Sequence, residues 1–94
     1  MSDKFSEVPV DKGTTILFQH EAKLGEYSVL YQKWYWDGIT AESIIFSTDD
    51  ISALTDDEIE SEVRISPLVN EDSSITLSHA ESGFTFVNFN FETE

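Results

Sequence analysis

The side chains best able to do chemistry are carboxylates, and seven of them lie within the sixteen residues from 47 to 62. No basic residue stands in this stretch. Carboxylates at this density can ligate a hard cation, act as an acid–base pair, or present negative charge to a cationic partner. The seven are Asp49, Asp50, Asp56, Asp57, Glu58, Glu60 and Glu62.

The spacing of these acids argues against the first two kinds of chemistry. A calcium loop needs alternating ligands, a glycine and a distant glutamate, whereas Asp49-Asp50 and Asp56-Asp57 are adjacent pairs. A glycosidase needs two carboxyls about 5–10 Å apart across a cleft, and among nineteen acids some pair meets that distance by chance. No phosphate-binding glycine loop or nucleophile elbow occurs. We expect a protein that is not an enzyme and has no cofactor or specific metal site.

The two histidines, His20 and His79, add no catalytic or metal-binding pattern. The chain has no cysteine, and neither histidine stands in an HExxH-like spacing. Each falls at the end of an expected strand. We predict that both are surface or hydrogen-bonded side chains.

The aromatic run Trp34-Tyr35-Trp36 has two interpretations. It is suited to stacking on a sugar or a base, or to anchoring a protein interface. The alternative, which we favour, places it in the core on one face of a strand and in a partly exposed pair on the other. Stacking on nucleic acid is disfavoured because no basic groove accompanies the aromatics.

Net charge is −14 and is unevenly distributed. Residues 1–36 carry five acids and four lysines, giving −1, whereas residues 37–94 carry fourteen acids and one arginine, giving −13. Such a protein repels nucleic acid and anionic lipid, and its association with basic proteins falls steeply with salt. Hydrophobic residues make up 39% of the chain, which argues for a folded domain rather than disorder.

Local patterns predict an α+β domain with an antiparallel sheet of about five strands in the order β-β-β-α-β-β and one acidic helix packed on it. Thr55 and Glu58 form a capping-box pattern, and Pro67 ends the helix. Asp37-Gly38 predicts a two-residue hairpin turn, and residues 21–25 a five-residue one. The expected helix covers residues 56 to about 65, and the expected strands cover residues 14–20, 26–36, 39–47, 74–79 and 84–91.

The ends of this domain raise further expectations. Residues 1–13 are polar and contain Pro9 and Gly13, which predicts a flexible lead-in to a single domain over residues 14–94. No signal peptide or membrane span is evident, so a cytoplasmic location is expected.

In the last strand, Phe84 and Phe86 alternate out of phase with Val87, Phe89 and Phe91. Either a bulge near residues 86–87 brings them to one face, or the strand is covered on both sides.

These observations favour a binding protein that inhibits or sequesters a basic, nucleic-acid-binding protein or nuclease by mimicking the charge of DNA. Anti-restriction, anti-CRISPR and nuclease-immunity proteins of phages and mobile elements work in this way. The expected contacts are the seven acids, extended by Glu71, Asp72 and Glu81, with Trp34 and Trp36 as aromatic anchors.

Two alternatives stay open. The first is an assembly module that binds through its aromatic strand or sheet edge, with a homodimer as one form, while the acidity only maintains solubility. The second is adaptation to a high-salt environment, against which the nearly neutral first 36 residues argue.

Overall fold

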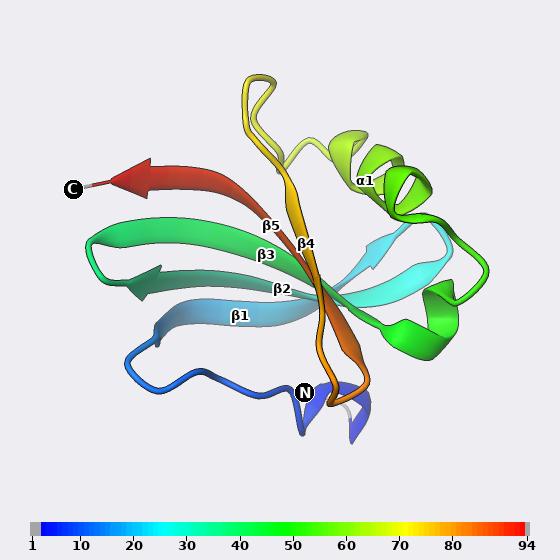
Figure 1. Ribbon diagram of the computed structural model, residues 1–94, viewed down its shortest axis with the longest axis horizontal. Coiled ribbons are helices and arrows are strands. Elements are labelled where there is room, and N and C mark those ends of the chain that lie inside the picture. The colour runs from blue at the N-terminus through cyan, green and yellow to red at the C-terminus, as the bar shows by residue number, and fades with distance from the viewer. Residues whose placement is uncertain (1–2, 94) are drawn as a thin grey trace.

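The structure is a computed structural model that describes residues 3–93, and it confirms the predicted α+β architecture (Figure 1). Five antiparallel strands pair in the order β1-β2-β3-β5-β4, so β1 and β4 are the edges of the sheet. The strands are β1 (Thr15–Leu24), β2 (Tyr27–Trp36), β3 (Ile39–Ser47), β4 (Thr76–His79) and β5 (Phe84–Thr93). The helices are α1 (Asp56–Arg64) and two short 3-10 helices, η1 (Asp3–Phe5) and η2 (Thr48–Ile51).

One of the two predicted hairpin turns is confirmed. Asp37 and Gly38 both have positive φ, 49° and 80°, as a tight two-residue turn requires. The predicted five-residue connection over residues 21–25 is wrong, because β1 continues to Leu24 and turns at residues 25–26. Pairing extends this far since Ala22 and Leu24 pack against the core beneath α1.

Strand β5 is covered on both faces. Val87 and Phe89 are buried on the α1 side, whereas Phe84 and Phe86 pack on the opposite side. The register with β3 is continuous from Phe84 to Phe89, so no bulge occurs at residues 86–87. The register shifts one step later, around Asn90, whose φ of 55° lies in the left-handed region that asparagine tolerates.

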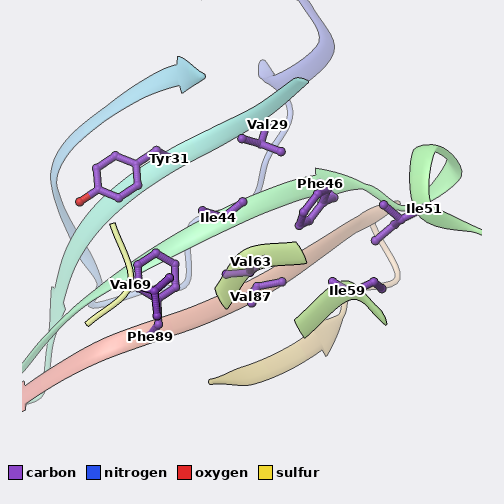
Figure 2. Packing of buried hydrophobic residues seen from close by; sticks show 10 residues of the cluster. All are labelled: Val29, Tyr31, Ile44, Phe46, Ile51, Ile59, Val63, Val69, Val87 and Phe89. Carbon is purple, nitrogen blue, oxygen red and sulfur yellow. The ribbon is translucent and has the colours of Figure 1, made fainter. Parts of the chain in front are cut away.

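The main core lies between α1 and the sheet (Figure 2). Ile59 and Val63 stand four residues apart on one helical face and are both buried. Figure 2 shows them directed toward the same layer as the sheet residues Val29, Ile44 and Val87. The remaining members of the cluster are Tyr31, Phe46, Ile51, Val69 and Phe89.

A smaller cluster covers part of the other face of the sheet. Phe5, which is only 2% exposed, packs with Leu30, Ile45 and Phe84, and its ring centroid lies 6.3 Å from that of Phe84. Figure 1 shows η1 and α1 on opposite sides of the sheet. Residues 3–13 therefore provide one of the two layers that cover it. The flexibility expected of this segment stays a prediction.

We expect Phe5→Ala to lower the free energy of unfolding by about 3 kcal/mol, because it removes a buried aromatic side chain from the smaller cluster. Chemical denaturation measures this loss. Val10→Ala, in the same segment but exposed, is the matched control and should change stability by less than about 0.5 kcal/mol. Equal effects of the two substitutions would show that the segment does not stabilise the sheet.

Candidate functional site

The acidic stretch folds into two helical pieces, and local hydrogen bonds fix the start of the longer one. Thr55 caps α1, because its Oγ1 accepts the Glu58 N–H at 3.2 Å, and Glu58 Oε1 accepts the Thr55 N–H at 3.0 Å. This confirms the predicted capping box. Asp56, Asp57 and Glu58 lie in the first turn, where the helix dipole stabilises negative charge. Asp49 and Asp50 lie in η2.

Three of the acids contact basic side chains, and their carboxylates stay exposed. Lys4 pairs with Asp50, and the His79 Nε2 lies 2.7 Å from the Asp56 Oδ1. Arg64 reaches Glu60 over 3.5 Å on the same helix. Exposed pairs of this kind contribute about 0–1 kcal/mol each, so their effect is to orient the carboxylates rather than to hold the fold together.

His79 connects the strands to both acidic helices. Its Nδ1 lies 3.0 Å from the Thr85 Oγ1, and Thr85 Oγ1 lies 2.9 Å from the Thr48 hydroxyl at the start of η2. The order Asp56–His79–Thr85 resembles a nucleophile activated by a base, but Thr85 is 0% exposed and cannot meet a substrate. His79 is a hydrogen-bonded surface histidine, as predicted, and it positions the start of α1.

The other expected acids have no such partner. Within residues 3–93 no hydrogen bond or ion pair engages the side chains of the remaining six. Their charge is therefore not neutralised by a neighbouring cation. These six are Asp49, Asp57, Glu62, Glu71, Asp72 and Glu81.

Two contacts bring the segments that carry the expected acids next to one another, and we call these acids together the acidic stripe. The Thr48 N–H donates to the Gly83 carbonyl at 2.9 Å, which places the β4–β5 turn and Glu81 beside η2. At the other end of α1, the Arg64 Nη2 donates to the Ser73 carbonyl at 3.2 Å, next to the loop that carries Glu71 and Asp72. The stripe thus runs from the turn through η2 and α1 to this loop, along one border of the molecule (Figure 1). Its members are Glu81, Asp49, Asp50, Asp56, Asp57, Glu58, Glu60, Glu62, Glu71 and Asp72.

Trp34 and Trp36 do not join the acidic stripe. They lie on β2 and line a groove on the sheet face opposite α1, where the Trp34 Nε1 donates to Ser43 Oγ at 2.7 Å. Trp34 and Tyr35 are half-buried and Trp36 is 45% exposed, so the prediction that one face of this run lies in the core is wrong, whereas the partly exposed side chains are as expected. The expected contact residues therefore form two separate surfaces.

Sequence reasoning missed a polar cluster at the β5 bulge. Tyr31 donates its hydroxyl to Glu42 Oε1, and the Asn90 Nδ2 donates to Glu42 Oε2 at 2.8 Å and to the Leu68 carbonyl at 2.7 Å. Burial, followed by the hydrogen bond and negative charge of Glu42, raises the pKa of Tyr31 well above its usual range. These residues stand 11 and 48 positions apart in the chain, a separation that no local pattern signals.

Comparison of the chain with known protein families, curated proteins and solved structures finds no significant match. Across residues 3–93, no three histidine, cysteine or acidic side chains gather closely enough to hold a metal ion. In the same part of the chain, no helix combines the length and apolar character needed to cross a bilayer.

The raised pKa of Tyr31 predicts a loss of stability in alkali. The fold favours the protonated phenol, so its contribution is complete below about pH 10, where an unfolded tyrosine titrates, and is lost as pH rises above that value. We expect Tyr31→Phe to lose less stability than the parent protein between neutral pH and about pH 11. Urea denaturation at a series of pH values measures this, and parallel curves for the two proteins would contradict it.

The capping box predicts a second change. Thr55→Ala removes the hydroxyl that accepts the Glu58 N–H and should lower the free energy of unfolding by about 1 kcal/mol. Ser61→Ala, an exposed site within the same helix, is the control and should have little effect. The denaturant midpoints of the two variants measure these changes in stability. An unchanged midpoint for Thr55→Ala would contradict the role of the cap.

Proposed function

We propose that this protein is a small acidic binding protein that occupies the nucleic-acid-binding groove of a basic protein by mimicking the charge of DNA. The observation that supports this most directly is that the segments that carry the acids, η2, α1 and the two adjoining loops, lie next to one another. The partner is a basic nucleic-acid-binding protein or nuclease. The function is then inhibition or sequestration, as in anti-restriction, anti-CRISPR or nuclease-immunity proteins.

The charge density of α1 is of the right order for this role. Nine residues rise about 13 Å, and five of them are acids, which is roughly one charge per 2.7 Å. Duplex DNA presents one charge per about 1.7 Å of axis. Neighbouring acids in η2 and the loops lengthen the row, while Arg64 is the only base within the helix.

The way the acids are held also favours binding. The capping box fixes Glu58, His79 restrains Asp56, and Lys4 restrains Asp50. Side chains that are already oriented lose less conformational freedom when a partner docks, which lowers the cost of association. Unpaired acids such as Asp49 and Asp57 are available to the basic side chains of that partner.

A second candidate function is assembly through the free edge of β1. This long strand pairs only with β2, and its Leu17 and Phe18 are about half exposed. An edge of this kind is a template for pairing with another chain, including a second copy. Assembly by this route would respond little to salt, whereas binding through the acidic stripe weakens steeply as salt rises.

Charge reversal tests the proposed function. Affinity capture from a lysate of the encoding organism at low salt identifies the basic partner, and titration then gives the Kd. Asp49→Lys with Asp57→Lys should weaken binding at least about tenfold, because two uncompensated contacts become repulsive. Duplex DNA should displace the protein from its partner.

The control is Asp11→Lys with Glu92→Lys, two exposed acids outside the acidic stripe. Each pair changes the net charge by the same four units, since every Asp or Glu to Lys exchange adds two. The control should bind within about twofold of the parent protein. An equal loss of affinity in the two double variants would rule out mimicry through the acidic stripe. Simultaneous binding of DNA and this protein to the partner would rule it out as well.

A further inference from the structure

The sheet face opposite α1 contains a groove of about 530 Å³. Phe5 and Val8 cover only one part of this face, and the groove lies over the rest. Residues 9–14 form one wall, and side chains from all the strands form the floor and the other walls. A volume of this size falls within the usual range for sites that bind small molecules.

The floor of the groove is a chain of hydrogen-bonded polar side chains. Ser43 accepts from the Trp34 Nε1 at 2.7 Å and donates to Asn88 Oδ1 at 2.5 Å. Because its oxygen is engaged and its Nδ2 already donates to Thr76 Oγ1 at 3.5 Å, Asn88 has one N–H donor left for a ligand. Gln32 donates its Nε2 to Gln19 Oε1 at 2.9 Å, which leaves the Gln32 carbonyl as an acceptor. The site therefore offers both donors and acceptors, all oriented by neighbours.

Aromatic rings supply the second feature of the groove. Trp36 is 45% exposed and Trp34 is half-buried, and both line the groove. The wall segment passes close to Trp36, because a Cβ added at Gly13 would stand 3.9 Å from the indole ring.

The groove is electrically neutral although the protein is strongly anionic. Asp11 and Lys12 are the only charged residues among its fourteen lining residues, and their charges cancel. None of the acidic stripe lines the groove. The groove therefore favours neither sign of charge, and an anionic ligand would also be repelled by the net charge of −14.

We propose that this groove binds a neutral carbohydrate chain. A sugar ring has an apolar face of C–H groups that packs on an indole, and hydroxyls around its rim that both donate and accept hydrogen bonds. The groove combines these two properties through Trp36 and through the side chains of Gln32 and Asn88. A peptide strand fits less well, because it adds to a sheet edge and this site lies on a sheet face whose backbone groups are already paired.

Titration of the full-length, ¹⁵N-labelled protein with neutral oligosaccharides tests this proposal. The probes are tetramers of β-1,4-glucose, α-1,4-glucose, β-1,4-xylose, β-1,4-mannose and β-1,4-N-acetylglucosamine, with tetragalacturonate as the charged probe. At least one neutral tetramer should cause saturable shifts in the indole N–H signals of Trp34 and Trp36 and in the side-chain amide of Asn88. Tetragalacturonate should bind more weakly than that tetramer.

Matched variants locate the binding. Trp36→Ala should weaken it about fivefold or more, because a stacking ring is lost. Asn88→Asp, which exchanges the amide donors for a carboxylate, should weaken it as well. Phe18→Ala removes an aromatic of similar exposure that does not line the groove, and should leave the affinity unchanged.

The proposal is overturned if no neutral tetramer binds, if only the charged tetramer binds, or if Trp36→Ala and Phe18→Ala behave alike. Capture of the basic partner is expected to survive Trp36→Ala, because this side chain lies outside the acidic stripe. The proposals of a carbohydrate site and of charge mimicry are therefore tested independently of each other.

Discussion

The need to cover both faces of the two central strands shapes the whole molecule. Strand β3 places Ile44 and Phe46 toward α1 and Ile45 toward the opposite side, and β5 divides its apolar residues in the same way. The apolar side chains on both faces must be covered, because burial of each aliphatic or aromatic side chain contributes roughly 1.5–3 kcal/mol. One helix and the segment before β1 provide the two covers.

These covers are short, and this determines where the two surfaces with functional potential lie. Helix α1 buries only the face that carries Ile59 and Val63, so its other faces remain available for acids. On the opposite side, η1 seals the sheet near Phe84, and the rest of that face becomes the groove beside Trp36. The acidic stripe and the neutral groove therefore both exist because the two covering elements are short.

Patterns within a few residues predicted much of the fold and part of the candidate site. The Thr55–Glu58 box and the Asp37-Gly38 turn are local signals, and each corresponds to the structure. The full length of β1 was not predicted, because Ala22 and Leu24 are kept in the strand by packing against core residues that are distant in the sequence. Local propensity does not encode such contacts.

The candidate site could also be predicted from the sequence only in part. The acids were evident from composition, but the Lys4, His79 and Arg64 side chains that orient three of them were not all predictable, since Lys4 and Asp50 are 46 residues apart. The polar floor of the groove joins Ser43 to Asn88 across 45 residues. The register shift in β5 lies at Asn90, which has a left-handed conformation, whereas the alternation of apolar residues suggested a bulge at residues 86–87.

The strand order β1-β2-β3-β5-β4 has a consequence for how the chain is made. The first three strands form a meander of consecutive hairpins, which can assemble as soon as they leave the ribosome. The free edge of β3 then stays unpaired until β5, the last of the five strands in chain order, is synthesised, and Phe5 has no partner until Phe84 is made. During translation this nascent sheet exposes apolar side chains and an unpaired edge, so the unfinished chain is the form most exposed to aggregation and most in need of a chaperone.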